Sequence, residues 1–297
     1  MNKISWRHHY IPQFYLRGFT NSLGTFKIFD VKEKGFLKEG KEFSPKSFFF
    51  EIDSNNLIED GIKNDFLETE HYKVQDQRVA KVFNKIRNAR PNCDFNLDPK
   101  DWPTLEYFIS CLFWRLPNNF SMIESLCNEN ELQDFGFKIV DNEEKEVNDQ
   151  TLFSHIKKDP SFAKFMKLHL PSITYPQIFD SNSERVIQTF PKGLPSICGD
   201  NPVILRNLKS VGLYTDDLIF PLSSTIVYLR GQTFSKDVIS LIKVEIDLLT
   251  FHQAIKYVSC TDEKYIYELI KLDEKSKYKF EQLKEHIFTK LFSYNTP

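Results

Sequence analysis

The sequence predicts an α+β fold, in which a helical middle region packs on an antiparallel sheet formed by N-terminal and C-terminal strands. Two segments, near 64–89 and 98–116, carry apolar residues at helical spacing. After residue 184, short β-branched and aromatic runs alternate with turn residues about every ten positions. The chain of 297 residues suits one compact domain over 1–297. A helical subdomain over 60–182 would then be inserted between the sheet-forming segments 1–59 and 183–297.

Two long helices are predicted in the middle region. The first spans about 64–89 and is closed by Arg90–Pro91. The second has Asp98 as its N-cap and Pro99 in its first turn, and it ends at Pro117. Its apolar stripe is broad, which predicts the most buried helix of the protein. Several short helices are expected between 120 and 182.

The strands are predicted from short runs of β-branched and aromatic residues. Near the N-terminus, Thr25 to Asp30 alternates weakly between apolar and polar side chains. The C-terminal runs are 185–190, 196–197, 202–205, 218–220 and 225–229. Two further helices are predicted at about 247–258 and 275–292.

Composition and motifs exclude several classes of protein. The formal net charge is −2, so no overall field attracts nucleic acid or an anionic membrane. The five cysteines are odd in number and lack metal-binding spacing, which favours reduced thiols and a cytoplasmic protein. No signal peptide and no run of ~18 apolar residues is present, so no membrane partner is expected. The sequence also lacks a P-loop, a G-x-G-x-x-G motif and a G-x-S-x-G motif.

Adjacent histidines near the N-terminus are the first candidate site. His8 and His9 can act as general acids, general bases or metal ligands. In a regular strand they point to opposite faces, so only one would reach a given site. The alternative is a structural pair whose ring nitrogens bond buried backbone groups.

Two further residues carry a functional and a structural interpretation each. Asp200, in the segment Cys198–Pro202, can bind a metal or orient a histidine, or it can simply accept backbone hydrogen bonds in a turn. Arg115, at the end of the apolar helix, can clamp a phosphate or carboxylate. It can equally complement the helix C-terminus or pair with an acid.

Charge is distributed unevenly along the middle of the chain. Residues 73–90 hold six basic side chains against one acid, and residues 124–149 hold nine acids against two lysines. The basic helix face is either solvated or a phosphate-facing stripe.

Several motifs, in order, resemble a large and mainly bacterial family, domain of unknown function 4238. They are RHHYIPQFYLRGF at 7–19, SPKSFFFE at 44–51, the two long helices, CGDNPVIL at 198–205 and IFPLSSTIVYL at 219–229. Cys198–Gly199 departs from the Thr–Ser that is usual there, and an Asn expected near 250 is not evident. The resemblance implies that polar residues from both ends of the chain meet in one pocket. It adds Gln13, Tyr15 and Arg17 as substrate-binding candidates, and Asn201, beside Asp200, is a fourth.

Two functions follow as expectations. In the first, the protein is a phosphodiester hydrolase acting on nucleic acid or a nucleotide, with a divalent metal ion as a candidate cofactor. His8, His9, Asp200 and Arg115 would be catalytic, and a role in bacterial defence would follow by analogy. In the second, the protein is a non-catalytic sensor or protein-interaction module whose N-terminal motif bridges the helices and the sheet.

Overall fold

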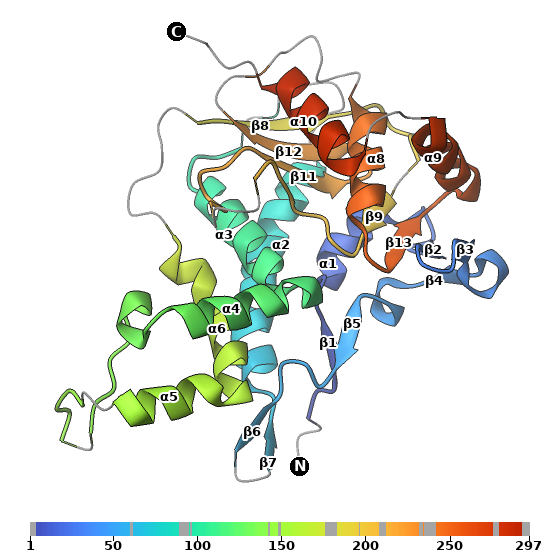
Figure 1. The fold of residues 1–297 in the computed structure, drawn as a ribbon. Coiled ribbons are helices and arrows are strands. Elements are labelled where there is room, and N and C mark those ends of the chain that lie inside the picture. Colours follow the sequence, from blue (N-terminus) through green and yellow to red (C-terminus); the bar gives the residue numbers. More distant parts are fainter. Residues whose placement is uncertain are drawn as a thin grey trace, which may run out of the picture.

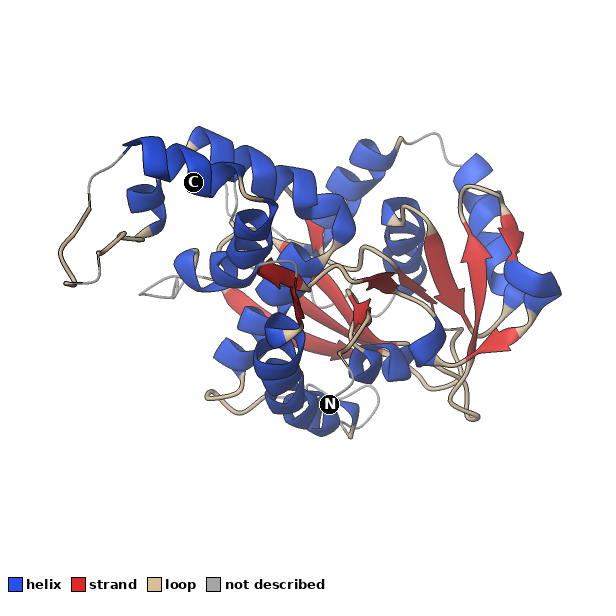
Figure 2. Ribbon diagram, turned by 90° about the horizontal axis from the view of Figure 1, so that it is seen from below, coloured by secondary structure: helices blue, strands red, loops and turns tan. Residues whose placement is uncertain are grey.

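The computed structural model confirms the predicted α+β class, with helices on both sides of antiparallel sheets (Figures 1 and 2). It describes residues 4–59, 62–88, 95, 97–141, 143–147, 150–175, 183–195, 197–207, 212–231, 234, 242–275 and 279–292. No described helix is long and apolar enough to cross a membrane.

One sheet lies between two layers of helices. Its order is β10–β11–β12–β8, all antiparallel. The strands are β8 (Glu184–Thr189), β10 (Ile204–Leu205), β11 (Leu218–Ser223) and β12 (Ile226–Gly231). In β11, Phe220 belongs to the core shared with the middle helices, whereas Ile219 packs with the C-terminal helices. Burial of both faces explains why this strand is a continuous apolar run.

A second sheet joins the two ends of the chain, as the sequence predicts. Its order is β3–β2–β13–β9, with β4 also paired to β2. The strands are β2 (Phe26–Asp30), β3 (Gly35–Phe36), β4 (Glu42–Phe43), β9 (Ile197–Gly199) and β13 (Tyr257–Cys260). Two small antiparallel pairs complete the strands, namely β1 (Arg7–His9) with β5 (Phe50–Ile52), and β6 (Leu57–Glu59) with β7 (Ile62–Asn64). The strands therefore form several sheets, not the single sheet that was expected.

The middle region is helical, as predicted. Its α-helices are α2 (Lys73–Arg87), α3 (Trp102–Arg115), α4 (Phe120–Glu129), α5 (Gln150–Lys158) and α6 (Pro160–Ile173), and α2 continues a π-helical segment, η4 (Leu67–Tyr72). The prediction that Asp98 caps α3 is wrong, because the helix begins at Trp102 with Asp101 at its N-cap and Pro103 in its first turn. Asp98 instead accepts a hydrogen bond from the Lys100 N–H in the preceding turn. The predicted stop at Arg90–Pro91 lies outside the described residues.

The C-terminal region differs from the prediction. Its helices are α8 (Lys243–Gln253), α9 (Glu263–Lys275) and α10 (Phe280–Leu291). The helix predicted over 247–258 stops at Gln253, because β2 and β9 provide ladder partners for residues 257–260 as β13. Helix α9 was not predicted.

Short elements complete the fold: α1 (Gln13–Leu16), η1 (Arg17–Phe19), η2 (Leu37–Gly40), η3 (Pro45–Ser47), η5 (Pro117–Asn119) and η6 (Leu132–Phe135).

Gly199 allows β9 to approach α8 closely, which gives a first prediction. A Cβ at this position would lie 2.9 Å from the Thr250 carbonyl oxygen and 3.3 Å from the Ala254 Cβ. We expect Gly199→Ala to lower the free energy of unfolding by about 1–3 kcal/mol in chemical denaturation, through overpacking. The matched control is Gly35→Ala, whose Cβ would meet no atom closer than 3.8 Å. Equal stability of the two variants would contradict this account.

Candidate functional site

His8 has both ring nitrogens engaged by the backbone. Its side chain is 1% exposed. Nδ1 accepts the Asn55 N–H at 2.9 Å, and Nε2 lies 3.2 Å from the Ser5 carbonyl oxygen. Burial lowers the pKa of His8, so the ring is neutral and Nε2–H donates to Ser5. This histidine therefore ties β1 to the loop after β5.

His9 presents an unused nitrogen. Because side chains alternate along β1, it points away from His8, and it is half-buried. Burial, followed by the charge of Arg115, lowers the pKa of His9 to about 4, while a hydrogen bond with the Pro45 backbone acts in the opposite direction. Nε2 is buried and has no partner among the described residues. His9 is therefore a neutral imidazole beside a buried cation.

Arg115 is buried between two carboxylates. Its Nη1 lies 3.3 Å from Asp76 Oδ1, and its Nη2 lies 3.8 Å from Glu68 Oε1. The guanidinium carbon is 4.3 Å from the centre of the Tyr72 ring. Burial alone would lower the pKa of Arg115, but Asp76 and Glu68 outweigh it and raise that pKa. Arg115 Nε and the Tyr72 hydroxyl are buried without partners in the described part of the chain.

A buried lysine extends this group of charges. Lys167 Nζ donates to Asn55 Oδ1 at 3.2 Å, and Asn55 Nδ2 donates to Glu68 Oε2 at 3.0 Å. Burial, followed by the nearby charge of Arg115, lowers the pKa of Lys167 to about 8. We use the name Arg115 cluster for the residues joined by these contacts, together with His9, on whose pKa Arg115 and Glu68 act: His9, Asn55, Glu68, Tyr72, Asp76, Arg115 and Lys167. Shifted pKa values gathered in one place are typical of functional sites.

Sequence reasoning found only two members of the cluster, His9 and Arg115. A signal for Lys167 was present, since it lies four residues after Ala163 and three before Leu170 on the buried face of α6. A lysine on an apolar helix face needs buried partners. Glu68, Tyr72 and Asp76 recur every four residues, which places them on neighbouring positions of η4 and α2.

Asp200 directly follows β9, and its carboxylate binds the backbone that leads into β13. Oδ1 accepts the Ile255 N–H at 2.8 Å, and Oδ2 accepts those of Lys256 and Tyr257 at 2.8 and 3.0 Å. Burial raises the pKa of Asp200, and these hydrogen bonds act against that rise. Its described contacts are thus separate from those of the Arg115 cluster. The carbonyl of Asn201 accepts from the Gln253 side chain at 2.8 Å.

The candidates on α1 and η1 also lie outside the Arg115 cluster. Tyr15 is fully buried, stacks on Phe220 and donates from its hydroxyl to the Pro221 carbonyl at 2.6 Å. Gln13 is half-buried, and Arg17 is exposed. Among the predicted candidates, the charge of Arg115 therefore acts on His9, whereas Tyr15 and Asp200 hold backbone elsewhere.

A cavity of about 420 Å³ gives access to the carboxylate side of the cluster. Glu68 and Asp76, the two acids that hold Arg115, form part of its wall, and the exposed Lys73 lies at its edge. In the described part of the chain, no group of three or more His, Cys, Asp or Glu side chains could hold a metal ion. The cluster combines a cation, two acids, a neutral imidazole and a lysine of lowered pKa, which together suit proton transfer beside an anion.

Burial of Lys167 gives a prediction for stability. The folded pKa of about 8 lies below the ordinary value of 10.5, so between these values the unfolded chain binds more protons. The free energy of unfolding should therefore rise with pH across this window, by about 3 kcal/mol from this group. The measurement is the difference between wild type and Lys167→Met in urea unfolding from pH 7 to 10. A pH-independent difference would contradict the lowered pKa.

Comparison with known proteins identifies the family. No curated protein and no solved structure matches the chain. The family of proteins of unknown function DUF4238 matches over residues 7–239, which includes β1, η4, α2, α3 and α6 and therefore every residue of the Arg115 cluster. This match covers most of the 297 residues, so the chain belongs to the DUF4238 family.

Proposed function

We propose that the protein is a phosphodiester hydrolase, nuclease-like in its chemistry, whose catalytic centre is the Arg115 cluster. One observation carries the proposal: His9 Nε2, Arg115 Nε and the Tyr72 hydroxyl are three buried polar atoms that have no partner among the described residues, in a single group of charges. Such atoms cost free energy unless a ligand or water binds them. A phosphoryl group offers acceptors to the two donors and a reaction centre beside the imidazole.

The residues of the cluster have complementary roles in this reaction. His9 takes a proton from the attacking water as that oxygen forms a bond to phosphorus. The phosphorus–oxygen bond to the leaving group then breaks, and the Lys167 ammonium protonates the departing oxygen. Arg115 and Tyr72 stabilise the negative charge that builds on the phosphoryl oxygens. Asn55 positions Lys167 through its 3.2 Å hydrogen bond.

The two acids of the cluster nearly cancel the charges of Arg115 and Lys167, and this balance determines how a substrate acts on the centre. Glu68 and Asp76 offset Arg115, so a phosphate competes with these acids for the guanidinium. Lys73 at the edge of the cavity supplies a further positive charge for the approaching anion. A bound phosphate places negative charge beside His9 and raises its pKa from about 4 toward neutrality, which makes the imidazole a better base.

A second candidate is a non-catalytic sensor or interaction module. The observation that favours it is that His8, Tyr15 and Asp200 all bond backbone groups, as a structural N-terminal motif would. Its partner surfaces would be the basic face of α2 and the acidic segment 124–149. We place either function in the cytoplasm, because Cys111, Cys127, Cys198 and Cys260 are free thiols. A role in bacterial defence, and a metal cofactor, rest on the sequence arguments alone.

The first test of this proposal is hydrolysis. Wild type should cleave at least one substrate from a panel of single-stranded and double-stranded DNA and RNA, assayed with Mg²⁺, Mn²⁺ or EDTA. His9→Gln should reduce the rate by about 100-fold or more, because it removes the general base. The matched control is His155→Gln, which changes an exposed histidine of α5 and should keep the wild-type rate. Circular dichroism and thermal unfolding establish that the variants are folded. No cleavage by wild type, or full activity of folded His9→Gln, would favour the non-catalytic module.

The pH dependence of the same reaction tests Lys167. Since its pKa is about 8, the ammonium that protonates the leaving group is lost above this pH. We expect kcat/KM to fall about tenfold per pH unit above pH 8. Lys167→Met should be slow at all pH values and lack this decline, whereas Lys158→Met, at an exposed position of α5, should retain it. If the fall in kcat/KM above pH 8 persists in Lys167→Met, another titrating group causes it.

A further inference from the structure

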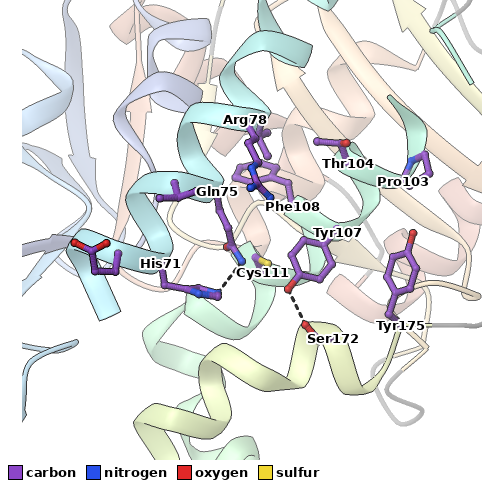
Figure 3. A pocket seen from close by; sticks show the side chains of 13 residues that line it. His71, Gln75, Arg78, Pro103, Thr104, Tyr107, Phe108, Cys111, Ser172 and Tyr175 are labelled. Carbon is purple, nitrogen blue, oxygen red and sulfur yellow. Dashed lines mark hydrogen bonds between the residues drawn. The ribbon is translucent and has the colours of Figure 1, made fainter. Parts of the chain in front are cut away.

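A second pocket, of about 680 Å³, lies between α2, α3 and the end of α6 (Figure 3). It contains no member of the Arg115 cluster. One face of α3 forms a wall, with Thr104, Tyr107, Phe108 and Cys111 at helical spacing. Cys111 lines the pocket and stands one turn before Arg115 on the same helix. The volume is in the range of sites for small organic molecules.

The pocket has an aromatic corner that suits a flat ring. The rings of Tyr107 and Tyr175 lie with centroids 6.0 Å apart at 66°. The Tyr107 hydroxyl and the Ser172 hydroxyl form a 2.8 Å hydrogen bond, which fixes Tyr107 against α6 (Figure 3). Phe108 and Pro103 add apolar surface to the same lining. A planar ligand can therefore stack on one tyrosine and meet the edge of the other.

An oriented carboxamide also lines the pocket. Gln75 Nε2 lies 2.9 Å from His71 Nε2 (Figure 3). Burial, followed by the charge of His169, lowers the pKa of His71, so the ring is neutral and its nitrogen accepts the Gln75 N–H. This bond fixes the carboxamide and leaves its oxygen as an acceptor. The oxygen of a fixed carboxamide can accept a hydrogen bond from an amino or ring N–H group of a nucleobase.

The rim of the pocket is positively charged. Arg78 lines it, is exposed and has no carboxylate partner in the described part of the chain. Lys81 stands one turn further along α2, likewise exposed and unpaired there. The acid Glu70 also lines the pocket, but it lies eight residues before Arg78, roughly 12 Å along a helix. Guanidinium groups bind phosphate through two parallel hydrogen bonds.

We infer that this pocket binds a nucleoside monophosphate, with its base in the tyrosine corner and against Gln75, and its phosphate on Arg78. This assignment gives a role to the exposed basic residues Arg78 and Lys81 of α2, which are not members of the Arg115 cluster. It requires no hydrolysis and does not rest on the proposed function. A nucleoside alone would make the base contacts and lose the phosphate contact.

The test is calorimetric titration of the full chain with AMP, GMP, CMP and UMP, with their nucleosides, and with inorganic phosphate. At least one nucleotide should bind saturably at one site, about tenfold more tightly than its nucleoside. Arg78→Gln should reduce nucleotide affinity to that of the nucleoside and leave nucleoside binding unchanged. Gln75→Ala should weaken both. Lys158→Gln, which removes an exposed charge on α5, should bind as wild type does.

Two outcomes overturn the inference. One is that none of the four nucleotides binds with a dissociation constant below about 1 mM. The other is that Arg78→Gln binds nucleotide as tightly as wild type. Nucleotide binding that persists in a protein without hydrolytic activity would remove the proposed function and leave this inference standing. Hydrolysis by a protein that binds no mononucleotide would overturn this inference and leave the proposed function standing.

Discussion

The arrangement of the middle region depends on the ion pairs that Arg115 makes with Glu68 and Asp76. A buried guanidinium without partners costs several kcal/mol, so α3 can carry Arg115 at its C-terminus only if acids are brought to it. Both acids come from the continuous η4–α2 segment. Glu68 then binds Asn55, which binds Lys167, so the loop after β5, the η4–α2 segment, α3 and α6 are linked through one charge. Removing that charge would leave the two acids without their counterpart.

The π-helical turn at η4 has a physical role in this arrangement. Glu68, Tyr72 and Asp76 are spaced by four residues, and an α-helix of 3.6 residues per turn displaces such positions steadily around its axis. A wider turn reduces that displacement at the start of the segment, where Glu68 and Tyr72 lie. The carboxylate, the ring and the second carboxylate therefore approach the same guanidinium. Segments of this kind recur at functional sites, which agrees with the buried polar atoms of this cluster that lack a partner among the described residues.

Local patterns predicted the elements better than they predicted the site. The apolar stripe of α3 and the short runs of β8, β11 and β12 report burial directly, so their positions followed from the sequence. The position of strand β13 could not be predicted from the local sequence, because its conformation depends on Asp200 and on ladder partners from distant segments. The Arg115 cluster combines residues from five separate segments, and no spacing rule brings Asn55 to Lys167. Asp200 is an error of the other kind. Its residue type suits a catalytic site, but its observed contacts hold the backbone.

The paired histidines explain how one motif can serve both structure and chemistry. In β1 the two side chains point to opposite faces, although the charges of Glu68 and Arg115 act on both rings. His8 bonds two backbone groups and holds the strand in place, which in turn fixes where His9 stands relative to Arg115. A regular strand is therefore compatible with a histidine site, because only one imidazole has to face the charge of Arg115. The same helices continue into the nucleotide pocket, where Cys111 and Gln75 lie one turn or less from Arg115 and Asp76. Any change in how α2 packs on α3 must consequently alter both sites together.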